Sequence, residues 1–114
     1  MVNSVLTRSN DDITVNCISW NTKGVNHIIK RNRVLSHLRS LKVNIAFLQE
    51  THLMSSDHNR LCKGWVGQLY HSNYQSKSRG AAILVNKNTP FIMQTVTADQ
   101  RDMLWSRVPC ITYL

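Results

Sequence analysis

Two polar residues stand where they could do phosphate chemistry together. Asn21 directly follows the run 18–20, and Glu50 directly follows the run 47–49. Both runs are expected to end strands, and the carboxyl ends of neighbouring strands in an α/β sheet converge on one crevice. An amide beside a carboxylate suits phosphate and Mg²⁺, because Mg²⁺ keeps several waters and takes only one or two protein carboxylates. The simpler alternative is that Asn21 makes a turn and Glu50 caps a loop.

Glu50 stands out because acidic residues are scarce. The chain of 114 residues has 14 Lys and Arg against 6 Asp and Glu, a net charge of +8, and Glu50 is its only Glu. Residues 13–98 hold eleven basic side chains and two acidic ones, Glu50 and Asp57. Such a surface attracts polyanions, because phosphate contacts supply a sequence-independent, salt-dependent binding term. We therefore expect the phosphate backbone of DNA as a partner; the alternative is a solvated basic surface with no partner.

The elements that position these residues follow from hydrophobic patterning. Residues 13–20 alternate between apolar and polar side chains, which predicts a half-buried strand followed by a turn at 21–24. Residues 28–41 have helical spacing. The predicted apolar stripe contains Ile28, Leu35, Leu38 and Leu41, with Ile29 and Val34 beside it, and the predicted outer face carries Lys30, Arg31, Arg33 and Arg39. Residues 43–49 predict a strand buried on both faces, and such a strand–helix–strand unit pairs its strands in parallel.

The rest of the chain predicts one mixed α/β domain. Three further strands are expected at 65–70, 81–85 and 91–96, and the polar residues 1–12 are expected to be loose. The longest apolar run, 81–85, is far shorter than the roughly 20 residues that span a bilayer, so no membrane partner is expected. Residues 1–20 contain no stretch like a secretory signal, which favours an intracellular, reducing compartment.

The cysteines predict neither a disulfide framework nor a zinc site. Cys17, Cys62 and Cys110 are odd in number and more than forty residues apart. There is no CxxC pair and no clustered His. Three buried free thiols are therefore expected.

Five sequence blocks together resemble the start of an endonuclease/exonuclease/phosphatase domain. The blocks are ISWNTKG at 18–24, KRNRVL at 30–35, IAFLQETHL at 45–53, GW at 64–65 and SRGAAILV at 78–85. The resemblance covers about residues 13–97. It is closest to the apurinic-like endonuclease domain that opens the polyprotein of LINE-type (non-LTR) retrotransposons, where QETHL after an apolar strand is a fairly specific feature.

The resemblance implies a fold, an activity and two site residues. It implies the N-terminal half of a DNase I-like α/β sandwich, with a mixed sheet and at least one crossover helix. Asn21 matches the Asn that contacts the scissile phosphate, and Glu50 matches the Glu that binds Mg²⁺. The family hydrolyses phosphodiesters by in-line attack of water, and its LINE-type members nick DNA to prime reverse transcription. Access to the nucleus follows by analogy with such elements.

The chain departs from the family in what comes later. Water activation there depends on a catalytic Tyr, an Asp-x-Asn pair and a closing Ser-Asp-His triplet, and the chain is expected to stop before them. Ser56, Asp57 and His58 spell the triplet only six residues after Glu50, so this match is expected to be coincidence. Residues 98–114 form a divergent tail.

An incomplete domain leads to three further expectations. The chain is expected to be inactive alone and to need the missing C-terminal half of the domain as a partner. Half a sandwich would leave an apolar face uncovered, and its members would be Ile45, Phe47, Ile83 and Val85. Two alternatives remain: a non-catalytic, basic nucleic-acid-binding remnant, and a phosphoesterase of the same fold that acts on phosphoinositides or other phosphoesters. The +8 charge and the Thr51–Leu53 context favour nucleic acid over the phosphoesterase.

Overall fold

The computed structural model describes residues 2–8, 14–72, 80–90 and 105–110. Within these residues it holds six strands, one α-helix and one 3₁₀ helix. In chain order they are β1 (Val2–Arg8), β2 (Thr14–Asn21), α1 (Ile28–Ser40), β3 (Ile45–Gln49), the 3₁₀ helix η1 (Ser55–Leu61), β4 (Val66–Ser72), β5 (Ala81–Asn86) and β6 (Trp105–Pro109).

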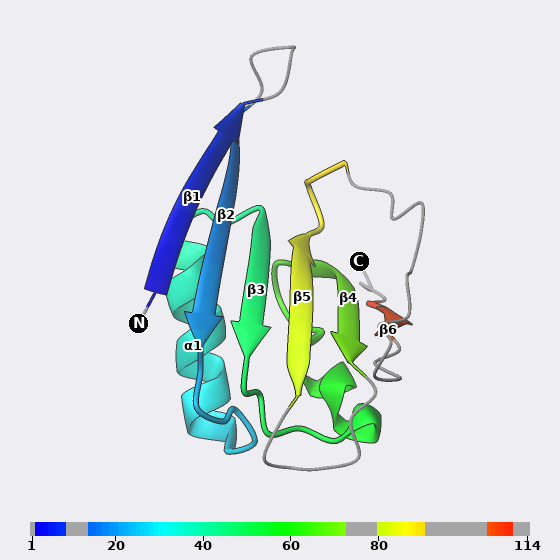
Figure 1. Cartoon of the computed structure of the whole chain (residues 1–114). Helices are drawn as coiled ribbons and strands as arrows, with labels where there is room; N and C mark the ends of the chain where they lie inside the picture. Colours follow the sequence, from blue (N-terminus) through cyan, green and yellow to red (C-terminus); the bar gives the residue numbers. More distant parts are fainter. Residues whose placement is uncertain (1, 9–13, 73–79, 91–104, 111–114) are drawn as a thin grey trace, which may run out of the picture.

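The strands form one mixed sheet in the order β1-β2-β3-β5-β4-β6 (Figure 1). β2 and β3 are parallel and are joined through α1, as the strand–helix–strand pattern predicts, whereas the other four pairings are antiparallel. The mixed α/β class is therefore confirmed. The carboxyl ends of β2, β3 and β4 share one end of the sheet with the amino end of β5, at the bottom of Figure 1. Asn21 lies opposite Gln49 at this end.

The core lies between one face of the sheet and the two helices. Ala46, Leu48 and Leu84 are fully buried on this face of β3 and β5. Leu38 of α1 and Leu61 of η1 are buried in the same cluster. The loops that follow the parallel strands β2 and β3 therefore begin at a sheet whose inner face is fully packed.

The buried face of α1 is rotated from the predicted one. Arg31, Val34, Leu35 and Leu38 are its buried residues. They follow the i, i+3, i+4, i+7 spacing of a single stripe. Ile28 is 53 % exposed and Ile29 is 56 % exposed. The predicted stripe is confirmed at Val34, Leu35 and Leu38 and is wrong at Ile28, Ile29 and Leu41, which are exposed. Arg31 was predicted on the outer face but lies inside, where backbone carbonyls accept from its guanidinium.

The sheet differs from the predicted one at its edges. Residues 2–8 were expected to be loose, yet they pair along the whole length of β2, because a backbone ladder needs no apolar alternation. Trp105–Pro109 lies in the expected tail and pairs with β4. The short helix η1 lies between the strands predicted at 43–49 and 65–70, where no element is predicted. The strand expected at 91–96 lies outside the described residues.

The sheet face away from the helices is partly covered. β3 is buried on one face rather than on both, and Phe47 is 41 % exposed. Ile45 and Ile83 are half-buried, but Val85 and Tyr70 on the same face are buried. The expectation that Ile45, Phe47, Ile83 and Val85 are all uncovered is therefore wrong for Val85. Among the described helices, none is long and apolar enough to cross a membrane.

The expectation of three buried free thiols is also wrong. Cys62 and Cys110 form a disulfide across a Cα–Cα distance of 5.2 Å, and Cys17 is a half-buried free thiol. The pairing of β6 with β4 brings Cys110, which follows β6, towards Cys62, which precedes β4. Spacing along the sequence carries no information about this contact.

Candidate phosphate and metal site

The loops after β2 and β3 are hydrogen-bonded to each other beyond the strand ends. Thr22 N donates to Gln49 O at 2.9 Å, Gly24 N to Glu50 O at 2.7 Å, and Val25 N to Thr51 O at 2.8 Å. These bonds continue the parallel pairing past Asn21 and Gln49. The structure thus places Asn21 and Glu50 at the ends of adjacent, joined strands, as the sequence predicts.

Asn21 serves the local turn with one end of its amide. Its Oδ1 accepts from Lys23 N at 3.1 Å, and the backbone then enters the left-handed region at Lys23 (φ 52°) and Gly24 (φ 102°). The simpler alternative from the sequence, that Asn21 makes a turn, holds for this oxygen. The Asn21 Nδ2 group has no hydrogen-bond partner among the described residues. That group can therefore donate to a phosphate oxygen.

Glu50 is exposed and sits in an unusual backbone conformation. Glu50 has φ 51° and His52 has φ 57°, both in the left-handed region that side chains other than Gly, Asn and Asp seldom adopt. Thr51 between them is fully buried, and Glu50 is exposed. Glu50 forms no ion pair with any residue in the described part of the chain. Strained backbone of this kind concentrates at functional sites, where the surrounding structure enforces it.

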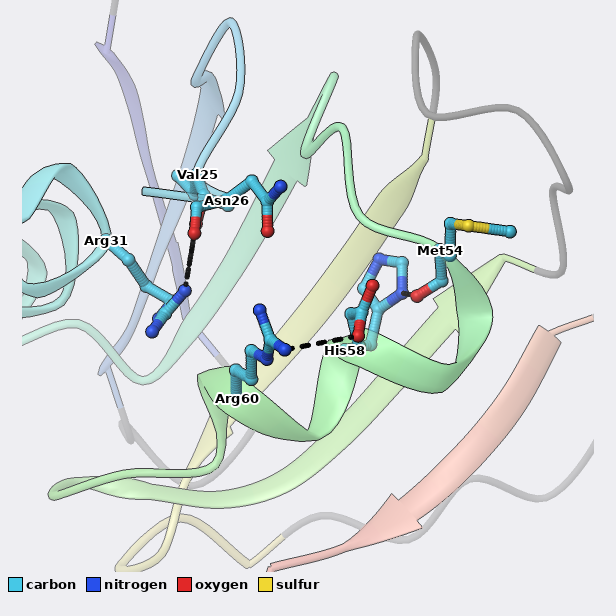
Figure 2. Close-up of polar contacts among 7 residues, drawn as sticks. Val25, Asn26, Arg31, Met54, His58 and Arg60 are labelled. Atoms are coloured by element: carbon cyan, nitrogen blue, oxygen red, sulfur yellow. Dashed lines mark hydrogen bonds and ion pairs between the residues drawn. The ribbon is translucent and has the colours of Figure 1, made fainter. Parts of the chain in front are cut away.

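A buried hydrogen-bond network holds the side chain of Thr51 in place. His58 is fully buried, and its Nδ1 donates to Met54 O at 2.9 Å, since a carbonyl only accepts (Figure 2). Its Nε2 therefore accepts from the Thr51 hydroxyl at 3.1 Å. Burial, and then the neighbouring His71, lowers the pKa of His58 from 6.5 to about 4, so the ring is neutral at pH 7. His71 stacks on this ring with the centroids 4.6 Å apart.

Gly80 lies against the same network. A Cβ at this position would come within 2.5 Å of Thr51 Oγ1, and Gly80 has φ 114°. Its carbonyl accepts from Thr51 N at 3.1 Å. The start of β5 thus holds the segment that carries Glu50.

Arg31 supports the loop that follows Asn21. Its side chain is 5 % exposed and points from α1 towards that loop, as Figure 2 shows. Nη1 donates to Asn26 O at 2.9 Å and to Val25 O at 3.5 Å, whereas Nε has no partner. The sequence reasoning missed this role because a charged residue was assigned to solvent. The signal was present in the i, i+3, i+4 spacing of Arg31, Val34 and Leu35.

Asp57 and His58 of the Ser56-Asp57-His58 triplet make contacts other than with Asn21 or Glu50. Asp57 pairs with Arg60 at 3.6 Å on η1. Both ring nitrogens of His58 are used in the buried network, and its contact with Met54 is drawn in Figure 2. That the triplet is coincidental stays a prediction. The network around His58, with His71 and Thr51, was not foreseen from the sequence.

The side chains at this site can supply Mg²⁺ with one carboxylate ligand. Among the described residues, no group of three or more His, Cys, Asp or Glu side chains comes together. Glu50 supplies a carboxylate directly after β3, and Asn21 lies on the adjoining strand. Mg²⁺ commonly takes one or two carboxylates and fills the remaining positions with water and substrate phosphate oxygens. Glu50 therefore suits a metal that arrives together with a phosphate.

The fold and the two joined loops define a small mixed α/β domain with a candidate phosphate site. No model of a known protein family matches the chain. An activity is therefore inferred from the geometry of the site.

Proposed function

We propose that this chain is the N-terminal part of a Mg²⁺-dependent DNA endonuclease domain of LINE-type retroelements, and that its site binds a phosphodiester. The observation that carries the proposal is the adjacency of Asn21 and Glu50 on two loops locked together by backbone hydrogen bonds. The charge of +8 supports a nucleic acid as the substrate. The strained backbone at Glu50 supports a functional reason for a carboxylate at that position.

Each side chain has a distinct task at the phosphate. Asn21 Nδ2 donates to a non-bridging phosphate oxygen and orients the group. Glu50 holds Mg²⁺, which when bound neutralises charge on the phosphate and on the leaving oxygen. The Arg31 and Thr51–His58 contacts keep the two loops in register, so little ordering of the protein is needed on binding.

Cleavage needs a group that activates water, and neither Asn21 nor Glu50 is assigned that task. We expect this group to come from a further segment of the same domain. The chain alone then binds DNA in a Mg²⁺-dependent manner without cutting it. Binding is the activity on which the proposal is tested.

The test measures binding of a short labelled DNA duplex by fluorescence anisotropy, in Mg²⁺ and in EDTA. Affinity is expected to be higher in Mg²⁺, and Glu50→Gln is expected to remove that increment. Asp57→Asn is the matched control, because it removes the same charge from η1, where Asp57 pairs with Arg60, and is expected to keep the increment. Binding by wild type that is equal in Mg²⁺ and EDTA would overturn the proposal.

Nicking of supercoiled plasmid separates binding from cleavage. No Mg²⁺-dependent nicking above the level of Glu50→Gln is expected from the chain alone. Nicking that Glu50→Gln abolishes would show that this segment builds a complete site and would contradict the role given to a further segment.

A non-catalytic nucleic-acid-binding protein is the second candidate, and the excess of basic over acidic residues favours it. It predicts DNA binding that depends on salt but is indifferent to Mg²⁺ and to Glu50→Gln. The same titrations therefore decide between the two functions.

A further inference from the structure

A basic pocket lies at the end of the sheet opposite Asn21 and Glu50. Its volume is about 630 Å³, and its lining includes Arg39, Lys42, Asn44, Trp65 and Lys87. β3 starts here and ends at Gln49, directly before Glu50, so its five residues separate the two sites by about 16 Å at a strand rise of about 3.3 Å per residue. A smaller hollow of about 170 Å³ shares Arg39 and Trp65 with the pocket and adds Lys63.

The floor of the basic pocket is held by a network of amide side chains. Asn16 N donates to Asn44 Oδ1 at 2.8 Å, and Asn86 N donates to Asn44 O at 2.8 Å. Asn86 Nδ2 donates to Val43 O at 3.2 Å. These bonds join β2, β3 and β5 at one level, so the pocket is formed before any ligand arrives.

Backbone features hold two of the cations at the pocket. Lys42 follows α1 with φ 53°, a left-handed position that glycine usually occupies at a helix end. Lys87 N donates to Trp65 O at 2.9 Å. A Cβ on Gly67 would lie 2.8 Å from Lys87 Cβ, so only glycine there lets the turn that carries Lys87 pack on β4. The two lysines are thus presented by fixed backbone.

The charge around the basic pocket is unbalanced. The acidic residues in the described part of the chain are Glu50 and Asp57, and neither lines the pocket. Arg39, Lys42, Lys63 and Lys87 are all exposed, and none of them forms an ion pair with a described residue. Arg39, Lys42 and Lys87 therefore line the basic pocket and Lys63 lines the adjoining hollow, with no carboxylate of the described residues among them.

The geometry favours an extended polyanion over a single enclosed anion. The nearby end of α1 is its C-terminus, the negative end of the helix dipole, which disfavours a small anion held tightly there. Exposed lysines act as point charges, and a strand with several phosphates can neutralise several of them with release of counterions.

We propose that the basic pocket and the adjoining hollow are a second nucleic-acid contact, at which Arg39, Lys42 and Lys87 of the pocket and Lys63 of the hollow bind the phosphate backbone away from Asn21 and Glu50. The proposal takes its ligand class from the proposed function but uses none of the same residues. It assigns the salt-dependent part of DNA binding to this pocket.

The test compares two double variants in EDTA, with the same labelled duplex. Lys42→Gln with Lys87→Gln removes two charges from the pocket, and Lys30→Gln with Arg33→Gln removes two from the exposed part of α1 outside it. The pocket variant is expected to weaken binding about tenfold or more near 0.1 M salt, and to reduce the slope of log K against log salt by about 1.5 to 2. The α1 variant is expected to change the slope by less than half as much.

Lys42→Arg with Lys87→Arg keeps the charges and is expected to bind like wild type. Equal weakening by the two Gln variants would overturn the proposal, because net charge alone would then explain binding. Displacement of the duplex by a nucleoside diphosphate at equal phosphate concentration would also overturn it, in favour of a small-ligand site.

The outcome is separable from that of the proposed function. A wild-type chain without a Mg²⁺ increment but with a strong effect of the pocket variant would remove the endonuclease proposal and keep the second contact. A Mg²⁺ increment lost in Glu50→Gln, with no special effect of the pocket variant, would do the reverse.

Discussion

At the scale of one residue, the left-handed backbone conformation of Glu50 costs stability. A side chain other than Gly in the left-handed region costs roughly 1 to 2 kcal/mol, because Cβ crowds the carbonyl oxygen. The protein carries this cost at Glu50 and again at His52, two residues later. Under the proposed function the carboxylate at this position holds Mg²⁺, which glycine could not do.

Replacing Glu50 with glycine tests this cost. Glu50→Gly is expected to unfold with a free energy about 1 kcal/mol higher than Glu50→Ala, because only Ala keeps a Cβ at φ 51°. Both variants are expected to lose the Mg²⁺ increment in DNA binding. Urea unfolding followed by Trp fluorescence measures the difference. Equal stabilities would show that the conformation costs nothing.

Acid should destabilise the protein through His58. The pKa of His58 is about 4 in the folded chain, against 6.5 for a free histidine, so the unfolded chain binds more protons between these values. The contribution of the neutral His58 ring to the free energy of unfolding is fully present above pH 6.5. It falls as the pH drops towards 4, by up to about 3 kcal/mol. His71 and Asp57 are the titratable neighbours of the ring.

Unfolding free energies at pH 7, 5.5 and 4.5 test this expectation. His58→Gln is expected to be less stable at pH 7, since it breaks the bonds to Thr51 and Met54, and to lose much of the pH dependence. A wild-type profile that is flat from pH 7 to 4.5 would contradict the buried neutral ring.

The sequence predicts the positions of Asn21 and Glu50 but not the buried contacts that support them. Both site residues directly follow runs whose patterning marks them as strands, so their place at a sheet end follows from local information. The stack of His58 on His71 exists only because η1 packs on β4. No local pattern encodes that contact, and η1 itself was not among the predicted elements.

At the scale of elements, α1 shows how a charge can mislead pattern reasoning. The position and length of the helix were predicted to within a residue, because its apolar residues recur with helical spacing. The prediction of its inner face was wrong at Ile28 and Arg31, because hydrophobicity alone favoured Ile28 for the buried position. Arg31 is tolerated inside because it donates to the carbonyls of Val25 and Asn26, which have no strand partner of their own.

Arg31→Met tests whether this contact supports the site. The variant keeps apolar length but removes a charged donor from two carbonyls, and the expected loss of stability is about 1 to 3 kcal/mol. The Mg²⁺ increment in DNA binding is expected to weaken, because the loop after Asn21 is less well held. Arg33→Met on the exposed face is the control, with an expected change within about 0.5 kcal/mol.

Unfolding curves and anisotropy titrations on both variants give the result. A stable Arg31→Met chain with an unchanged Mg²⁺ increment would mean that Arg31 only fills space.

For the whole molecule, the predictable part is the four inner strands β2, β3, β5 and β4, and the unpredictable part is the two edge strands β1 and β6. The β2–α1–β3 unit follows from patterning and from the handedness of crossover connections. The pairings of β1 with β2 and of β6 with β4 add both edge strands, and residues 2–8 and 105–109 lacked the alternation that would have marked them. The disulfide depends on the second of these pairings, so it was missed for the same reason.

The disulfide offers a test of how far β6 contributes to the fold. Cys62 and Cys110 are 48 residues apart, and closing a loop of that length restricts the unfolded chain by up to about 4 kcal/mol. Cys62→Ser is therefore expected to lower the stability of the oxidised protein by about 2 to 4 kcal/mol and to remove its response to dithiothreitol. Cys17→Ser is the matched control, because Cys17 is a free thiol in β2 and its loss leaves that response intact. Melting of the wild-type protein that is identical with and without reductant would show that β6 is held to β4 by the strand ladder alone, and that the cross-link adds nothing to the six-stranded sheet.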